Sequence, residues 1–287
     1  MTDVVCVGLA TLDTIYDVPF HPDPDGRVVA AELAVAGGGP AATAAVAVAR
    51  LGSSAAFVGA VADDEVGAAV REGLGREGVD VSGLAVVPGM RSPQSSVLVE
   101  RDTGGRVIVH YPGTVPPVAL SPHARELCRD ATWVHVDHVG FGPVQGLTLR
   151  GRLSVDGGNP IDGLELDGVA LYAPTERALR EQFGDADGAI AAGAALVVVT
   201  RGADGSLAVT RDGTTIEAAG VSVDAVSTLG AGDVFHGALL AFLVRGVALA
   251  EALHRANAAA ALSTRALDGR SAIPTLAELE AQRRAEL

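Results

Sequence analysis

Short, continuously apolar runs alternate along this chain with longer segments in which apolar residues recur every three or four positions. Runs such as Val4–Gly8 and Ala55–Val61 are typical of strands that are buried on both faces. Further strands are predicted at residues 95–100, 107–111, 133–136, 153–155, 169–172 and 196–200. The longer segments predict helices at residues 66–77, 143–150 and 176–183, and another that stops at Gly52. This alternation predicts βαβ units around a mostly parallel sheet.

Two segments show a stricter alternation of apolar and polar residues. They are Ile15–Val18 and Arg27–Val35, and a turn rich in proline and aspartate separates them at residues 21–26. Strict alternation is typical of strands with one solvated face. We therefore predict a hairpin that projects from the main sheet.

The composition and the charge narrow the fold class and the partners. The 287 residues are 48% hydrophobic but only 3% aromatic, so the core must consist of alanine, valine and leucine, as suits strands covered by helices on both faces. We expect one main domain, which is common for α/β folds of this length. The net charge of −14 argues against nucleic acid or an anionic membrane as a partner. All 21 basic residues are arginines, so an anion must be held by Arg, His or a bound metal.

Cysteine usage and apolar stretches indicate the compartment. Cys6 and Cys128 stand in apolar segments, which predicts buried packing residues in a reducing environment and not a disulfide or metal pair. The N-terminus lacks the basic region of a secretory signal. The longest apolar stretches, residues 189–199 and 234–244, are shorter than the ~20 residues that a membrane-spanning helix needs. We expect a cytoplasmic protein.

The most informative motif is Thr228–Phe235, where a glycine-rich turn runs into a long apolar segment. Gly230 and Gly232 can adopt backbone angles closed to other residues, so successive N–H groups can converge on an anion at the positive end of the following helix. Asp233 would repel a phosphate, which favours a role as the base that accepts a proton from an attacking hydroxyl. The motif indicates a kinase centre; the alternative is an ordinary turn in which Asp233 caps the helix.

Four other segments accompany this motif in a characteristic order. They are the strand Val4–Gly8 followed by Asp13, the glycine-rich Gly37–Gly52, the turn Val198–Gly205, and Asn257 in an alanine-rich segment. With them the chain resembles the ribokinase family of sugar kinases, also called the phosphofructokinase B family, over nearly its whole length. The resemblance implies a ribokinase-like three-layer α/β/α sandwich with a mostly parallel central sheet.

The resemblance also implies roles for residues around the phosphoryl group. Asp233 would be the catalytic base, and the amides of Gly230, Ala231 and Gly232 would stabilise charge on the transferring phosphoryl oxygens. ATP would be the donor, and Mg²⁺ would bridge its phosphates. Glu176 would act on the metal indirectly, through water, although an acidic residue also suits the first turn of a helix for dipole reasons alone. The nucleotide-binding residues implied are Thr200, Gly202, Gly205 and Asn257.

A small β lid over the sugar is a further implication, at about residues 14–35 and 90–112, and such lids often mediate dimerisation. We therefore expect a homodimer formed through the lid. The sugar-binding residues expected are Asp13, Arg27, Gly37, Gly38, Gln94, His110 and Asp137. A carboxylate such as Asp13 can accept two hydroxyl hydrogen bonds from one sugar, although an Asx turn would also place aspartate there.

Three positions depart from the family pattern. Ala42 stands where the family has an asparagine that binds the sugar, so one expected hydrogen bond to the sugar is missing. Ala173 replaces the asparagine of the family's Asn-x-x-Glu motif, which influences metal and phosphate binding. Ser227 stands where potassium-activated members have aspartate. A monovalent-cation requirement is therefore not expected.

The glycine-rich loop and several other segments, among them Gly269–Pro274, resemble the bacterial 6-deoxy-6-sulfofructose kinases, which phosphorylate the 1-hydroxyl of that sugar. A sulfonate needs a cation, and Arg27 matches a basic lid position of that subgroup, although it could equally be a solvated turn residue. His110 stands where the subgroup has asparagine, and its second pocket arginine has no clear counterpart here. Another ketose, a ketose phosphate, a pentose or a nucleoside remain alternative acceptors.

Two other function classes fit the chain less well. A dinucleotide-dependent oxidoreductase needs a G-x-G-x-x-G pattern directly after the first strand, and Gly8–Leu12 lacks it. A regulator that binds sugar or ATP without catalysis would be expected to lose the base, and Asp233 is present.

Overall fold

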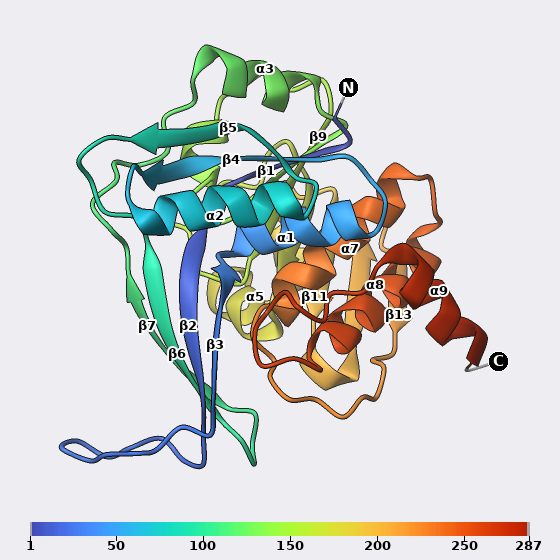
Figure 1. Ribbon diagram of the computed structural model, residues 1–287. Helices are drawn as coiled ribbons and strands as arrows, with labels where there is room; N and C mark the ends of the chain where they lie inside the picture. Colours follow the sequence, from blue (N-terminus) through green and yellow to red (C-terminus); the bar gives the residue numbers. More distant parts are fainter. Residues whose placement is uncertain (1, 286–287) are drawn as a thin grey trace.

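The structure of the protein, a computed structural model, describes residues 2–285, so residues 1, 286 and 287 of the predicted domain lie outside the described range. Its centre is a nine-stranded sheet with the strand order β13-β12-β11-β10-β9-β8-β1-β4-β5 (Figure 1). The strands are β1 Val4–Val7, β4 Ala55–Ala62, β5 Asp80–Val87, β8 Trp133–Val136, β9 Arg152–Gly157, β10 Val169–Pro174, β11 Leu196–Thr200, β12 Ser206–Thr210 and β13 Thr215–Ala218. The pairings are parallel except those of β12, which is antiparallel to both of its neighbours.

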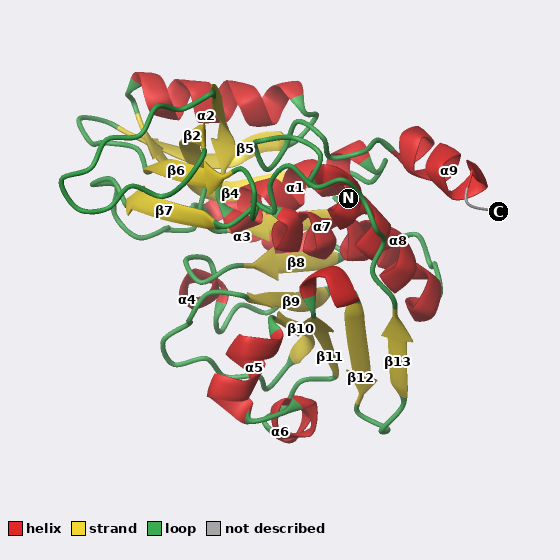
Figure 2. Cartoon of the chain, turned by 90° about the horizontal axis from the view of Figure 1, so that it is seen from below, coloured by secondary structure: helices red, strands yellow, loops and turns green. Residues whose placement is uncertain are grey.

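Helices cover both faces of this sheet (Figure 2). One face carries α1 Pro40–Arg50, α2 Glu65–Arg76, α7 Ala231–Val244 and α8 Leu249–Ser263, with α9 Leu276–Ala285 beside them. The other face carries α3 Pro122–Asp130, α4 Phe141–Val144, α5 Glu176–Phe183 and α6 Ala186–Ala191. The predicted three-layer α/β/α sandwich with a mostly parallel central sheet is confirmed.

Strand β1 illustrates why such strands are continuously apolar. Val4 and Cys6 belong to the core cluster on the side of α1 and α7, whereas Val5 and Val7 belong to the cluster on the opposite side. Successive side chains of a strand point to opposite faces, and each fully buried valine contributes on the order of 1.5–3 kcal/mol. Because both faces are covered, an alternating pattern would leave polar groups in one of the two cores.

A second sheet of four strands lies beside the central sheet, in the order β3-β2-β6-β7 (Figure 1). Its strands are β2 Thr11–Val18, β3 Glu32–Gly38, β6 Gln94–Glu100 and β7 Arg106–Tyr111. These strands overlap the two segments that the family resemblance assigns to a lid, although β2 begins before residue 14 and β3 ends after residue 35, and we call them the lid sheet. On its inner face Ile15, Val97 and Val99 pack with Leu267 and Leu229, so the sheet is anchored to the main body.

Three local predictions differ from the observed elements. The helix predicted at residues 143–150 is wrong: α4 ends at Val144, because Gln145 leaves helical geometry and Gly146 has a φ of 80°. The strand predicted at 27–35 begins only at Glu32, since residues 19–31 form a long loop. Strands β5, β12 and β13 were not among the predicted strands.

Two expectations about cysteines and membranes can be compared with the described residues. Cys6 and Cys128 are both buried and unpaired, as predicted. Between residues 2 and 285 there is no helix with the length and apolar character needed to cross a bilayer.

Candidate active site

A pocket opens where the lid sheet and the glycine-rich loop before α1 meet the N-terminus of α7. Its lining consists of Asp13, Ile15, Gly37, Gly38, Gly39, Thr43, Leu229, Gly230, Asp233 and Gly269. The lining therefore joins segments from both ends of the chain. It brings together several of the residues predicted for the sugar and for the phosphoryl group.

The start of α7 has the form of an anion site. Gly230 is its N-cap residue and has a left-handed backbone conformation, with φ 72° and ψ −2°, which only glycine adopts at low cost. No side chain of the described residues caps the helix. The N–H of Ala231 donates to the carbonyl oxygen of Thr228 at 3.3 Å, whereas the N–H groups of Gly232 and Asp233 in the first turn point towards an anion at the positive end of the helix dipole. Ser227 is buried, and its Oγ accepts a hydrogen bond from the amide of Leu229 at 3.2 Å, which stabilises the preceding turn.

The carboxyl of Asp233 lies in the first turn of α7 and lines the pocket. Burial and the nearby charges of Asp156 and Asp137 raise its pKa to about 7, whereas His236 and Arg106 lower it. A carboxylate with a pKa near neutrality is a better proton acceptor than an ordinary aspartate and is still ionised in a large share of molecules. The position and the basicity of Asp233 suit a general base.

The carboxyl of Asp13 approaches the glycine loop from β2. It is 8% exposed, and its Oδ1 is buried without a hydrogen-bond partner among the described residues. Burial raises its pKa, and hydrogen bonds from Thr11 and Ser95 oppose that effect. A Cβ atom at Gly38 would lie 2.0 Å from Asp13 Oδ2, so the residue at position 38 has to be glycine for the carboxyl to sit there. A buried acceptor with a free lone pair fits a sugar hydroxyl.

The side chain of Arg270 fixes the glycine loop, and the sequence did not single it out as a site residue. Its Nη2 donates to the carbonyl oxygen of Gly38 at 2.7 Å, and its Nε donates to Thr43 Oγ1 at 3.1 Å. Burial lowers its pKa to about 10, and the charges of Asp13 and Asp233 oppose that shift, so the guanidinium stays charged at neutral pH. Only the sequence run Gly269–Pro274, which belongs to the sulfofructose-kinase resemblance, drew attention to this region.

Cross-strand register determines which lid residues face Asp13. Asp13 pairs with Ser95, and Ser95 pairs with His110; Ser95 Oγ and His110 Nδ1 are 3.3 Å apart. Gln94 pairs with Leu12 and therefore lies on the opposite face of the sheet. The structure thus places His110 on the face of Asp13, and it places Ser95 where Gln94 was expected.

Arg106 of β7 links the lid sheet to the anion site. Its Nη1 donates a 2.7 Å hydrogen bond to the hydroxyl of Thr228, two residues before Gly230. Its charge also lowers the pKa of Asp233. Arg27, in contrast, is exposed in the loop of residues 19–31, which projects away from the body of the protein (Figure 1). The structure therefore offers Arg106 as the lid arginine nearest to the transferring group.

Both carboxyl oxygens of Asp137 accept hydrogen bonds from backbone amides. Its Oδ2 accepts hydrogen bonds from Leu9 at 2.8 Å and Ala41 at 3.2 Å, and its Oδ1 accepts from Val139 at 2.8 Å and Gly140 at 3.0 Å. These bonds hold the loop after β1 and the start of α1. This geometry differs from the predicted sugar contact, because both oxygens already accept two bonds each.

The residues predicted for the nucleotide gather around the loop that follows β13. Asn257 donates from Nδ2 to the carbonyl oxygens of Ala218 and Ala219, at 3.0 and 3.1 Å. A Cβ atom at Gly205 would lie 2.2 Å from the oxygen of Ala218, so the turn containing Gly202 packs directly on that loop. The hydroxyl of Thr200 donates to the carbonyl of Pro174 at 3.4 Å. Asn257 therefore fixes the backbone of this region, and its predicted contact with the nucleotide stays a prediction.

Glu176 begins α5 at the edge of the same region. Thr175 caps the helix, and the isolated bridge between Thr175 and Thr200 places the start of α5 beside the end of β11. The carboxyl of Glu176 is exposed and lies 3.7 Å from Arg180, a weak surface ion pair. An exposed carboxylate of this kind fits the indirect, water-mediated contact to Mg²⁺ that was predicted, because Mg²⁺ usually keeps several of its waters.

Similarity to known proteins extends over almost the whole chain. A family model described as pfkB family carbohydrate kinase matches residues 1–146 and 168–276. The ribokinase of Haemophilus influenzae is 24% identical over 303 residues, with 95% of each chain covered. The ATP-dependent ribose-1-phosphate kinase of Halopiger xanaduensis is 29% identical over 294 residues, with 96% of each chain covered. The structure of Arabidopsis thaliana ribokinase complexed with ribose and ATP superposes with a TM-score of 0.80 at 22% identity, with 98% of each chain covered.

Proposed function

The chain belongs to the pfkB family of carbohydrate kinases, and from this membership we propose that it transfers the γ-phosphoryl group of ATP to a sugar hydroxyl held against Asp233. ATP-dependent sugar phosphorylation is the activity of the family and of the similar kinases. The observation that carries the assignment of residues is the position of Asp233. Its carboxyl lines the same pocket as Asp13, directly at the N-terminus of α7.

The proposed reaction uses these groups in one step. The sugar hydroxyl gives its proton to the Asp233 carboxylate while its oxygen attacks the γ-phosphorus. The bond from that phosphorus to the oxygen bridging the β- and γ-phosphates breaks, and ADP leaves with the electron pair. The amides of Gly230, Ala231, Gly232 and Asp233 stabilise the charge on the phosphoryl oxygens. Bound Mg²⁺ would supply charge neutralisation on the ATP phosphates, and Glu176 would hold it indirectly, through water.

Asp13 and the glycine loop would orient the sugar. The unpartnered Oδ1 of Asp13 accepts a sugar hydroxyl, and the close approach of Gly37 and Gly38 leaves backbone groups at the pocket surface. Arg270 holds this loop and keeps the two glycines in place. A buried hydrogen-bond acceptor without a donor is costly. This arrangement therefore favours a sugar substrate that is rich in hydroxyl groups.

For the acceptor we propose an anionic ketose, either 6-deoxy-6-sulfofructose or a ketose phosphate. His110 lies on the face of the lid sheet that carries Asp13, and Arg106 reaches the anion loop from the same strand. Arg27 could reach a ligand only if the loop of residues 19–31 folded inwards or came from a second subunit. Neutral fructose, ribose and a nucleoside are the alternatives that the first experiment must separate.

That experiment measures Mg-ATP-dependent ADP release with sulfofructose, fructose 6-phosphate, tagatose 6-phosphate, fructose, ribose and adenosine. The proposal expects the highest kcat/KM with an anionic ketose, and it expects Arg106→Ala to reduce that value more than the value for fructose. A preference for ribose, fructose or adenosine would contradict the proposed acceptor but leave the kinase assignment intact. Lack of turnover with every acceptor would favour a protein that binds sugar or ATP without catalysis.

We also propose a homodimer that forms through the outer face of the lid sheet. This face is apolar and exposed: Leu33, Val35, Val107, Val109 and Tyr111 have exposed fractions between 45% and 65%. The register of the sheet puts these side chains on the face opposite Asp13. Contiguous exposed apolar surface is typical of interaction sites. A cytoplasmic location is proposed as well, because ATP is the donor and both cysteines are buried free thiols.

A further inference from the structure

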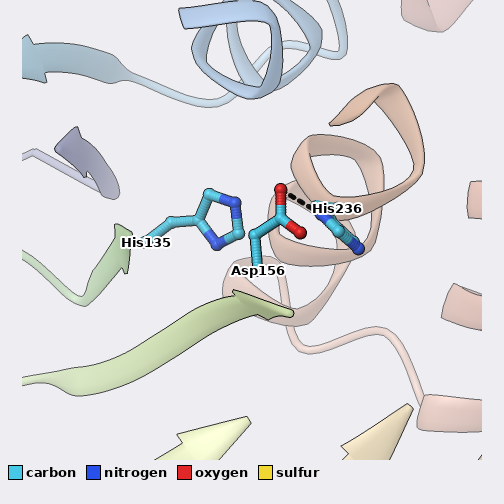
Figure 3. Close-up of side chains that lie close together, drawn as sticks. All are labelled: His135, Asp156 and His236. Carbon is cyan, nitrogen blue, oxygen red and sulfur yellow. Dashed lines mark ion pairs between the residues drawn. The ribbon is translucent and has the colours of Figure 1, made fainter. Parts of the chain in front are cut away.

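Three side chains of the kind that bind metals meet beneath α7, outside the pocket described above. They are His135 from β8, Asp156 from β9 and His236 from α7 (Figure 3). One donor atom from each lies within 4.8 Å of the other two. In Figure 3 the carboxyl of Asp156 stands between the two imidazole rings. The exposed fractions are 0% for His135, 3% for Asp156 and 5% for His236, so the cluster is closed to bulk water.

Three of the four imidazole nitrogens of this cluster lack a hydrogen bond to the described residues. Among the described residues, His135 Nε2 and both ring nitrogens of His236 are buried without a hydrogen bond. Buried polar atoms are nearly always paired with protein, water or an ion. Protonation of His236 would explain only some of these unpaired nitrogens. It would form an ion pair with Asp156, but Nε2 of His135 would still lack a partner among the described residues.

The orientation of His135 is fixed from its other side. Its Nδ1 lies 3.0 Å from the hydroxyl of Ser154, the residue two positions before Asp156 on β9. We assign the proton to Nδ1, which donates to Ser154 Oγ, so that Nε2 keeps its lone pair. A histidine ligand typically donates its second N–H to an oxygen in this way, which sets the tautomer and the ring plane.

The separations already approach those of a coordinated ion. Ligands at ~2.0–2.1 Å from a tetrahedral Zn²⁺ are about 3.3 Å apart. His236 Nδ1 and Asp156 Oδ2 are 3.4 Å apart. The other donor-atom separations are at most 4.8 Å, and the three side chains come from two strands and one helix.

We propose that His135, Asp156 and His236 bind one divalent transition-metal ion of the Zn²⁺ type. Two imidazoles and one carboxylate form a ligand set that suits Zn²⁺ and disfavours Mg²⁺, which prefers oxygen ligands. This ion is therefore different in kind from the Mg²⁺ that accompanies ATP. It would join β8 and β9 to α7 one helical turn below Asp233, and so hold the helix that carries the base.

The test uses the full-length protein and Co²⁺ as a visible probe, and it reads metal binding instead of kinase activity. After removal of bound metal with a chelator, Co²⁺ should produce d–d absorption that saturates at one ion per chain. Zn²⁺ should abolish this absorption by displacement, whereas an excess of Mg²⁺ should not. His236→Asn should abolish the absorption, and Ser154→Ala, which leaves the three ligands in place, should weaken binding by about 10–100-fold.

His254→Asn is the matched control, because His254 is exposed on α8 and lies outside the cluster. It should leave the Co²⁺ titration unchanged. If the wild-type protein shows no saturable absorption, or if Ser154→Ala and His236→Asn bind Co²⁺ as the wild type does, the proposal is overturned. Circular dichroism identifies a variant that fails to fold, and in that event the wild-type titration and Ser154→Ala decide the result.

Discussion

The guanidinium of Arg270 donates a 2.7 Å hydrogen bond to the carbonyl oxygen of Gly38, although the two residues are 232 positions apart in the chain. This bond, together with the one from Nε of Arg270 to Thr43 of α1, ties the loop after α8 to the glycine-rich segment and to the first turn of α1. Arg50 donates in turn to the carbonyl of Arg270 at 3.0 Å. The shape of the sugar side of the pocket therefore depends on a residue near the C-terminus.

Arg270→Ala should lower stability and weaken sugar binding, because it removes the buried guanidinium and, with it, the hydrogen bonds to Gly38 and Thr43. We expect a loss of about 3–6 kcal/mol in the free energy of unfolding, since the two hydrogen bonds to the charged group contribute ~1.5–3 kcal/mol each. Thermal unfolding and the KM for the sugar measure both effects. Arg71→Ala, at an exposed position of α2, is the control. An unchanged KM for the sugar would show that the loop holds its shape without Arg270.

Asp233→Asn should remove most turnover while ATP binding stays close to that of the wild type. The amide cannot accept the proton, and a general base typically contributes ~10²–10⁴-fold to the rate. Single-turnover kinetics and calorimetric titration with ATP separate the two effects. Asp187→Asn, at an exposed position of α6, should have no effect on either. Turnover within a few-fold of the wild type would rule out Asp233 as the base.

The pH profile should report the raised pKa of Asp233. Because burial raises that pKa to about 7, the base is protonated below this value, and kcat/KM should fall as the pH decreases from 8 to 6. The same shift affects stability: a carboxyl whose pKa is higher in the folded than in the unfolded state stabilises the fold at low pH, and this contribution is lost as the pH rises through about 7.

Asp233→Asn should therefore raise the melting temperature more at pH 8 than at pH 5. Melting curves of the variant and the wild type at the two pH values show at which pH the gain in melting temperature is larger. A larger gain at pH 5 would show that the Asp233 pKa is not raised in the folded protein.

Gly38→Ala should displace the carboxyl of Asp13, because the added Cβ would lie 2.0 Å from its Oδ2. We expect a higher KM for the sugar, an unchanged KM for ATP, and a stability loss of about 1–3 kcal/mol. Gly73→Ala is the matched control: it lies in α2, and a Cβ there meets nothing within 4 Å. That change should stabilise the protein by ~0.5–1 kcal/mol. A stability gain from Gly38→Ala would mean that Asp13 can move away at no cost.

Val109→Glu should disrupt the proposed dimer. Val109 is 65% exposed on the outer face of the lid sheet, and the dimer would bury the new carboxylate in its interface, which is costly. Analytical ultracentrifugation should show a shift from dimer to monomer. Val86→Glu, on β5 and 45% exposed, is the control and should not change the oligomeric state. If the wild type sediments as a monomer at all concentrations, this proposal fails and the apolar face needs another explanation.

Local features could be predicted from the sequence because they depend on residues close together in the chain. The buried strands follow from continuous apolar runs, and β1 and β8 lie where those runs stand. The left-handed Gly230 and the position of Asp233 in the first turn of a helix follow from the order of residues around them. Where the local signal was weak, as in residues 143–150, the predicted helix was wrong, because Gly146 ends it early.

What only the tertiary structure decided are the contacts between distant segments. Strand register placed Ser95 instead of Gln94 beside Asp13. Four backbone amides donate hydrogen bonds to the carboxyl of Asp137. The partners of Arg270 lie more than two hundred positions away, and His135, Asp156 and His236 come from three separate elements. Periodicity and turn chemistry act over a few residues, whereas these contacts depend on how strands and helices pack, so no local pattern could indicate them.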